Sequence, residues 1–118
     1  MGITLKEIIE TLDATIVLND HDEQMVVERA RASDLMSDVL NRIKPGALLL
    51  TGLTTPQSIY TAEMADVTVV CYVRGKRPPA ETLRLAKERG LVLLSTNLPM
   101  YESCGRLYRK GLKGGSEA

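Results

Sequence analysis

One stretch, Ile43–Thr55, carries the clearest structural signal in this chain: it reads Ile-Lys-Pro-Gly-Ala-Leu-Leu-Leu-Thr-Gly-Leu-Thr-Thr. Lys44-Pro45-Gly46 ends a helix, because the residue before a proline is forced out of the α region and glycine accepts the turn that follows. Ala47–Leu50 is apolar without alternation, which is typical of a strand covered on both faces. Thr51–Thr55 then forms a loop, and Pro56 suits the first turn of another helix. The stretch therefore predicts a helix, a central strand and a second helix.

Upstream of this stretch the sequence predicts one helix and two strands. Thr4 and Glu7 have the spacing of a capping box, and apolar residues recur with a helical period up to Leu12. Ala14–Leu18 is apolar and β-branched, which favours a strand. Met25–Arg31 alternates poorly, and we interpret it as one further strand.

Two helices flank the central strand. Ser33 is the predicted N-cap of the first helix, which ends at Lys44. Its buried stripe is expected to contain Leu35, Met36, Val39, Leu40 and Ile43. The second helix begins at Pro56 and is expected to direct inward the side chains of Ile59, Ala62 and Met64.

The alternation of strand and helix continues toward the C-terminus. Val67–Val73 predicts a strand, and Arg74–Arg77 is its exit loop. Pro78-Pro79 begins a helix that ends at Gly90, a residue that favours the C′ position. Leu91–Ser95 predicts the next strand.

A last helix follows Asn97 and Pro99. Its predicted inward face contains Met100, Cys104, Leu107 and Tyr108. Arg109 and Lys110 supply a cationic last turn, and Gly111 ends the helix. We expect residues 113–118 to form a frayed, flexible tail.

This order of elements predicts an α/β fold. Because helices and strands alternate with short connections, the sheet should be mostly parallel, with about five strands and helices on both faces. The 118 residues fit one domain, which we place at residues 1–112.

The composition excludes several classes of partner. The formal net charge of +0 argues against nucleic acid, and no apolar run is long enough for a membrane span. A cytoplasmic location follows as the default. Cys71 and Cys104 form no Cys-x-x-Cys pair, which argues against a zinc site and favours two reduced thiols.

The strongest candidate site lies where the predicted parallel strands end, because ligands of open parallel sheets collect at this edge. The candidate residues are Thr51, Gly52, Thr54, Thr55, Arg74, Gly75, Lys76, Arg77, Thr96 and Asn97. Their hydroxyls, glycines, cations and adjoining helix N-termini would suit a small anion such as a phosphate. The alternative, which we favour on frequency, is that they are ordinary caps and turn residues.

Catalytic groups are hard to identify. The single histidine, His21, lies in an acidic turn, and Cys104 falls on an apolar helix face where it would pack as a small hydrophobe. Asp34 and Asp38 have metal-ligand spacing on one helix, but we interpret both as a solvated face. The sequence contains neither of the glycine-rich phosphate-binding motifs, G-x-x-x-x-G-K-[ST] and G-x-G-x-x-G. We therefore predict no enzyme, no cofactor and no metal.

Several segments together resemble the DRTGG-domain family over nearly the whole chain. They are Ala32–Leu40, Arg74–Thr82, Ala86–Gly90 and Gly105–Tyr108. The segment that would align with the name-giving residues, Gln24–Ala30, lacks paired glycines. Thr54–Ile59 likewise stands where small stand-alone relatives tend to have a histidine.

The resemblance implies an α/β regulatory or assembly domain, dimeric and without established chemistry. Domains of this family occur between or beside CBS pairs in regulated pyrophosphatases. They also resemble the N-terminal, non-kinase domain of HPr kinase/phosphorylase. Our first hypothesis is a homodimeric regulatory domain that senses a small anionic metabolite or nucleotide. The alternative is a ligand-free interaction or accessory subunit of a hydrogenase or fermentation-related complex, with a protein partner in that redox or fermentation system.

Overall fold

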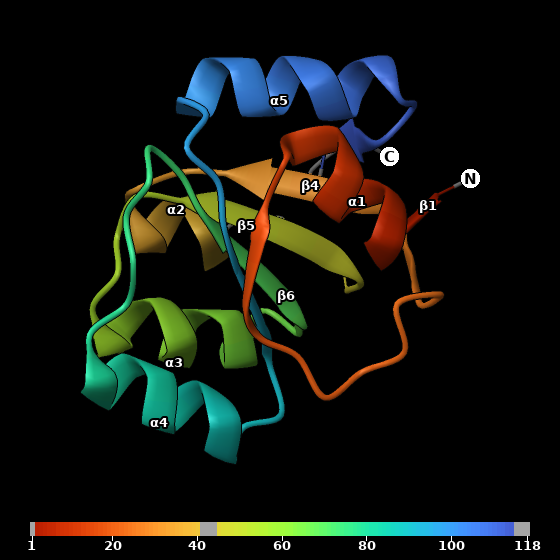
Figure 1. The fold of residues 1–118 in the computed structure, drawn as a ribbon. Coiled ribbons are helices and arrows are strands. Elements are labelled where there is room, and N and C mark those ends of the chain that lie inside the picture. Colours follow the sequence, from red (N-terminus) through yellow and green to blue (C-terminus); the bar gives the residue numbers. More distant parts are fainter. Residues whose placement is uncertain (1, 41–44, 115–118) are drawn as a thin grey trace.

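The computed structural model describes residues 2–40 and 45–114 (Figure 1). The helices are α1 (Leu5–Leu12), α2 (Met36–Leu40), α3 (Pro56–Met64), α4 (Ala80–Glu88) and α5 (Met100–Arg109). The strands are β1 (Ile3–Thr4), β2 (Thr15–Leu18), β3 (Val26–Val27), β4 (Arg29–Ala32), β5 (Ala47–Thr51), β6 (Val69–Tyr72), β7 (Val92–Ser95) and β8 (Lys113–Gly114).

Six strands form one mixed sheet in the order β2-β7-β6-β5-β4-β8. Strands β4 to β7 are parallel neighbours in chain order, β8 adds a further parallel strand beside β4, and β2 alone is antiparallel. A separate antiparallel pair joins β1 to β3. The α/β prediction with a mostly parallel sheet is confirmed.

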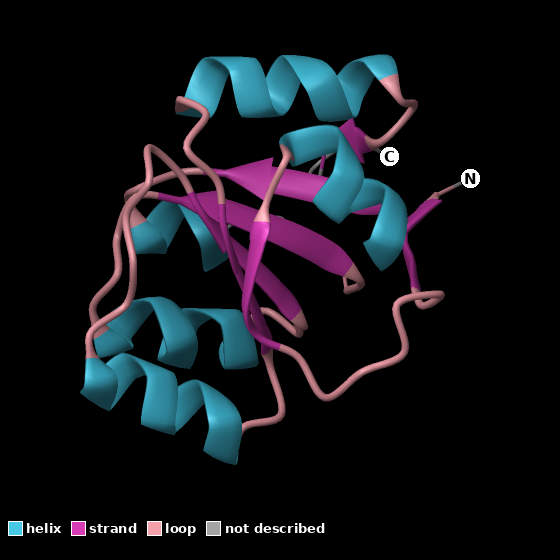
Figure 2. Ribbon diagram, in the orientation of Figure 1, coloured by secondary structure: helices cyan, strands magenta, loops and turns pink. Residues whose placement is uncertain are grey.

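The sheet is covered on both faces, because successive side chains of its central strands point to opposite sides. Leu48 and Leu50 pack with α1 and α5, whereas Ala47 and Leu49 pack with α2, α3 and α4. Figure 2 shows the sheet between these two helical layers. The continuous apolar run of β5 is therefore explained, since all five of its residues are buried.

The predicted helix signals act as expected. The Glu7 N–H donates to Thr4 Oγ1 over 3.1 Å, and Glu7 Oε1 accepts from the Thr4 N–H over 3.1 Å, so the capping box is formed. Pro56 is the first residue of α3. Gly90 follows α4 with a φ of +69°, a conformation that glycine adopts without strain.

The predicted strand Met25–Arg31 is wrong as a single element. It divides into β3, which pairs with β1, and β4, which joins the main sheet. Its irregular polarity reflects this change of partner at Glu28. Lys113 and Gly114 form β8 instead of a frayed tail, so the sheet has six strands; residues 115–118 lie outside the described part.

Four side chains predicted to face inward are exposed: Leu35, Leu40, Met64 and Tyr108. The helix after Ser33 begins only at Met36, so Leu35 precedes it, and Met36 and Val39 alone bury in its one turn. Met64 ends α3 and is rotated away from the buried Ile59 and Ala62. The predicted positions Ile43 and Lys44 lie outside the described residues.

Candidate functional site

The ends of four parallel strands meet at one edge of the sheet, as the sequence predicted for three of them. Thr51 is level with Tyr72, and Tyr72 is level with Ser95. Ala32, the last residue of β4, is level with Leu50. The loops after β4, β5, β6 and β7 therefore leave the sheet together, and we call this region the carboxyl edge.

The loop after β6 is held in a strained conformation. Arg74 and Gly75 have φ values of +58° and +70°, in the left-handed region that disfavours side chains with a β-carbon. The Arg74 N–H donates to Leu98 O over 2.9 Å, and the Gly75 N–H donates to Thr96 O over 2.8 Å. These bonds fix the cationic loop against the loop after β7.

Two of the predicted hydroxyls are occupied within the fold. Thr96 is buried, and its Oγ1 donates to Leu12 O over 2.6 Å. Thr51 is also buried, and its Oγ1 donates to Asp34 Oδ1 over 3.2 Å and accepts from the Leu53 N–H. Both side chains thus stabilise loops, as the alternative of caps and turn residues predicts.

Asp34 is the residue of this edge that sequence reasoning missed. Its Oδ1 accepts from the Gly52 N–H over 2.6 Å, and its Oδ2 lies 3.8 Å from Arg74 Nη2. A β-carbon at Gly52 would lie only 2.7 Å from Arg74 Nη2, so the glycine lets the guanidinium approach the backbone. Asp34 is exposed, as its interpretation as a solvated residue predicts, but its carboxylate also holds the loop after β5. The signal that could have found it is its position after a strand that ends at Ala32.

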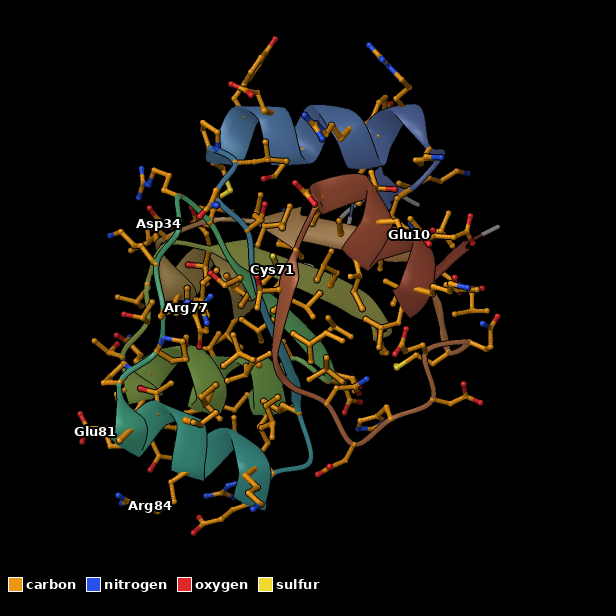
Figure 3. The ribbon with its side chains drawn as sticks, viewed as in Figure 1. Glu10, Asp34, Cys71, Arg77, Glu81 and Arg84 are labelled. Atoms are coloured by element: carbon orange, nitrogen blue, oxygen red, sulfur yellow. The ribbon has the colours of Figure 1, made fainter. Side chains whose placement is uncertain are left out.

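The remaining predicted residues lie toward solvent at the same edge. Those with exposed side chains are Thr55, Arg74, Lys76, Arg77 and Asn97. Thr54 contributes its carbonyl oxygen, which accepts from Thr82 Oγ1 over 2.8 Å. Figure 3 shows Asp34 and Arg77 on the same side of the molecule, with Cys71 in the interior. The carboxyl edge thus presents three cations outward.

Three helices, α3, α4 and α5, start from the loops of the carboxyl edge. Their N-caps are Thr55, Pro79 and Pro99, and none of these side chains caps its helix with a hydrogen bond. The first N–H groups of a helix carry partial positive charge. They add to the positive field of the three cations.

Burial raises the pKa of three side chains in the strands and in α5. It raises the pKa of the Cys71 thiol to about 12 and also raises the pKa of Cys104. The pKa of Tyr72 is raised by burial, an effect that its hydrogen bond with Ser58 partly opposes. These groups therefore stay neutral near pH 7.

His21 and the acidic residues form no metal centre in the part of the chain that the structure describes. His21 lies at the surface, where its Nε2 is 2.7 Å from Gly90 O. Within residues 2–40 and 45–114, no helix has the length and apolar character that crossing a membrane requires.

We compared the sequence with models of known protein families. The model of the DRTGG domain matches residues 7–109. The chain belongs to the DRTGG domain family. The resemblance deduced from the sequence is therefore confirmed. No match was found among the curated proteins.

A solved structure shares the fold of this DRTGG domain. It is a crystal structure of the CBS and DRTGG domains of the regulatory region of Clostridium perfringens pyrophosphatase, complexed with the activator diadenosine tetraphosphate. The TM-score is 0.70 and the sequence identity 18%, over 93% of this chain and 47% of that chain. Our chain therefore spans about half the length of the solved structure.

The DRTGG domain also has an apolar groove on the face of the sheet that α5 covers. It lies between β4, β8 and α5, has a volume of about 160 Å³, and includes Leu50, Cys104 and Leu107 in its walls. The small side chains of Ala30 and Ala32 leave this space under α5. Tyr108 lies against the same groove, although most of its side chain is exposed.

Proposed function

We propose that this DRTGG domain is a non-enzymatic, cytoplasmic regulatory domain that homodimerises and senses a small anionic metabolite or nucleotide at the carboxyl edge. One observation carries the proposal: the loop with Arg74, Lys76 and Arg77 is pinned in a strained conformation with exposed side chains. Strained backbone is often retained where it serves binding. Of the set deduced from the sequence, the exposed residues Thr55, Arg74, Lys76, Arg77 and Asn97 would contact the ligand, whereas Thr51 and Thr96 hold the loops and Asp34 positions Arg74.

The electrostatics of this edge favour an anion that can exchange. The Arg74–Asp34 pair is about half exposed on both sides, and its 3.8 Å separation is long. Exposed pairs of this kind contribute only about 0–1 kcal/mol. A phosphate can therefore engage Arg74 without breaking a strong internal interaction.

The solved structure of similar fold supports a nucleotide among the candidate ligands. That regulatory region binds diadenosine tetraphosphate, an activator with a chain of anionic phosphates. Its role as part of a regulatory region likewise supports a regulatory role for this DRTGG domain. The identity of the ligand rests on the experiment below.

The titratable groups support a function without catalysis. The shifted pKa values of Glu7, Cys71, Tyr72 and Cys104 all move away from neutral pH. Catalytic acids and bases have pKa values tuned toward the working pH.

A thermal-shift screen tests the sensor. The purified domain is heated with adenine nucleotides, diadenosine tetraphosphate, acetyl phosphate and pyrophosphate, and its mass is measured by light scattering. A ligand that binds only the folded state must raise the melting temperature in a saturable way. Replacing Lys76 and Arg77 with alanine should abolish the rise.

The matched control replaces Arg84 and Lys87, two exposed cations of α4, with alanine. This variant removes the same charge and should keep the ligand response. If both variants respond alike, or if no anion stabilises the wild type, the anion-sensing role is wrong.

The alternative function is a ligand-free interaction or accessory subunit of a hydrogenase or fermentation-related complex. The apolar groove beside β4 and β8 favours it, because apolar hollows at a surface often receive a side chain of a partner protein. A dimer or monomer that ignores every anion yet retains a redox-complex protein in a pull-down would support this alternative.

A further inference from the structure

The outer face of α5 carries more positive than negative charge. We define this face by the exposed residues of the helix and its C-cap, which are Tyr101, Glu102, Gly105, Arg106, Tyr108, Arg109 and Lys110. Figure 1 shows α1 and the sheet on one side of α5 only. Three of these residues are cations and one is an acid, although the whole chain has a formal net charge of +0. The positive excess is therefore local to this helix.

The fold pairs these cations only in part. No ion pair between described residues involves α5. Arg106 donates from Nη1 to Thr11 O over 3.3 Å, which holds its side chain toward α1 without neutralising its charge. The charge of Lys110 acts on the Glu7 carboxylate of α1, so it is partly balanced. The side chain of Arg109 makes no hydrogen bond or ion pair within residues 2–40 and 45–114.

Two open hollows adjoin along this face. One has a volume of about 340 Å³ and lies around Tyr101 and Gly105; the other has a volume of about 370 Å³ and extends to Lys110. A β-carbon at Gly105 would meet no atom within 4 Å, so this glycine leaves the space empty. Arg106 and Arg109 line both hollows. The two hollows therefore form one depression that shares both arginines.

The tyrosines and the cations lie on different flanks of the outer face. An α-helix turns by about 100° per residue, so Tyr101 and Tyr108 project on one side and Arg106 and Lys110 on the other. Tyr108 lies against the apolar groove under α5, and Arg106 lies beside Thr11 of α1. The face is thus aromatic toward the groove and cationic toward α1.

We propose that the outer face of α5 binds an acidic segment of a partner protein. Carboxylates of this segment would pair with Arg106 and Arg109, because guanidinium groups bind carboxylates through two parallel hydrogen bonds. An apolar side chain beside these acids would pack on Tyr108 and enter the apolar groove. An engineered apolar cavity of about 150 Å³ binds benzene, so a groove of about 160 Å³ has room for one such side chain.

The charges and the aromatic residues select this partner over the other candidates. Two copies of the face would bring three cations against three cations, and like charges across an interface are unfavourable. A nucleic acid would place its phosphates against Glu102, and an anionic membrane would need a broad apolar helix face. Tyrosine and arginine are instead enriched in protein interfaces, and Tyr101 is 87% exposed.

The inference holds with or without an anion at the carboxyl edge, because a regulatory domain and an accessory subunit both need a protein on which to act. A displayed library of short random peptides, selected on the full 118-residue chain, tests it. The selected peptides should be rich in aspartate and glutamate beside an apolar residue. The peptide that binds most tightly is then labelled, and fluorescence anisotropy measures its Kd.

Two variants of α5 should weaken this peptide. Arg109→Glu reverses a charge that the fold does not use, and Tyr101→Ala removes the exposed ring. Each change should raise the Kd about tenfold or more. The matched controls are Arg84→Glu, at an exposed cation of α4, and Tyr60→Ala, at a half-exposed tyrosine of α3. Both controls should keep the wild-type Kd, and all four variants should give cooperative melting curves.

Several results would overturn the α5 site. They are a selection that yields no peptide or peptides without acidic residues, and a Kd that Arg109→Glu leaves unchanged. Displacement of the peptide by pyrophosphate, a single-stranded oligonucleotide or anionic vesicles would show a general anion surface instead of a protein site.

The variant with alanine at Lys76 and Arg77 separates this site from the carboxyl edge. It should bind the peptide as the wild type does while losing the anion response. Loss of peptide binding in this variant would assign the acidic partner to the carboxyl edge and overturn the α5 site. A peptide result of either kind leaves the anion-sensing role to its own thermal-shift screen.

Discussion

The carboxyl edge of the sheet and the outer face of α5 are both rich in polar residues, but they use them differently. At the edge, the hydroxyls of Thr51 and Thr96 and the carboxylate of Asp34 bond to groups of neighbouring loops. On α5, Glu102 and Arg109 make no ion pair within the described residues. The first region is closed by its own chain, and the second leaves these charges in solvent.

This difference separates polar groups that stabilise the fold from polar groups that remain available for binding. A buried donor or acceptor must be paired, because leaving it unpaired costs about 1–3 kcal/mol. Polar residues at strand ends therefore serve the backbone first, and only the surplus can bind a ligand. At the carboxyl edge the surplus is cationic: Arg74, Lys76 and Arg77.

The largest effect should come from breaking the closure of the edge. Thr96→Val keeps the side-chain shape but leaves Leu12 O and the Leu98 N–H without their hydroxyl partner. One buried group and one half-buried group lose a bond, so the free energy of unfolding should fall by about 3 kcal/mol. Urea unfolding measures the loss.

Thr55→Val is the matched control for this prediction. Thr55 lies at the same edge, but its side chain is exposed and makes no capping bond. Its replacement should change the free energy of unfolding by no more than about 0.5 kcal/mol. Equal effects of the two changes would show that the edge is not closed through Thr96.

A smaller loss should follow from straining the cationic loop. In Gly75→Val a branched side chain must adopt the left-handed conformation, which costs about 1–2 kcal/mol. The new β-carbon would also lie 3.0 Å from Asn97 Oδ1, which must shift. We expect a total loss of about 2 kcal/mol by urea unfolding, together with a weakened anion response.

Gly90→Val isolates the contribution of strain. Gly90 has nearly the same φ, but a β-carbon at this position would meet no atom within 4 Å. Its replacement should cost less than that of Gly75 and leave the anion response intact. An unchanged melting temperature and an unchanged anion response in Gly75→Val would together refute the assignment of this loop.

Much of this fold could be predicted from the sequence because local signals agree with it. The apolar run of β5, the capping box of Thr4 and Glu7 and the glycine after α4 each act within a few residues. The division of Met25–Arg31 could not be predicted, since it depends on which distant strands pair with β3 and β4. The same holds for β8, whose two residues pair only because β4 offers an edge.

The candidate site could also be predicted only in part: its position in the fold was predictable, but the contacts of its side chains were not. Parallel strands place the loops of Thr51, Arg74 and Thr96 at one edge, and this convergence follows from topology alone. Which hydroxyls are buried depends on tertiary contacts such as that between Thr96 and Leu12. Asp34 was missed for the same reason as β4, because its role requires knowing where that strand ends.

The glycine of α5 should respond with the opposite sign. Gly105→Ala introduces a β-carbon into open space within a helix, so the free energy of unfolding should rise by about 0.5–1 kcal/mol. Urea unfolding measures the gain. A loss of stability would mean that Gly105 serves the fold, as the glycines of the carboxyl edge do.

The smallest effect should appear at Glu7 in the capping box of α1. The charge of Lys110, at the end of α5, acts on its carboxylate. The Thr4 backbone N–H lowers the pKa of Glu7 below its ordinary 4.5, followed by the Thr4 hydroxyl and then the charge of Lys110. The folded pKa is depressed, so the ionised carboxylate stabilises the fold above about pH 4.5, and this contribution disappears as the pH falls through the folded value. Glu7→Gln should therefore melt below the wild type at neutral pH and converge with it in strong acid. In a Thr4→Ala background, which removes the hydroxyl but keeps the backbone N–H, this pH dependence should shrink without vanishing; a difference between Glu7→Gln and the wild type that is as large in strong acid as at neutral pH would show that the charge of Glu7 contributes nothing to the capping box.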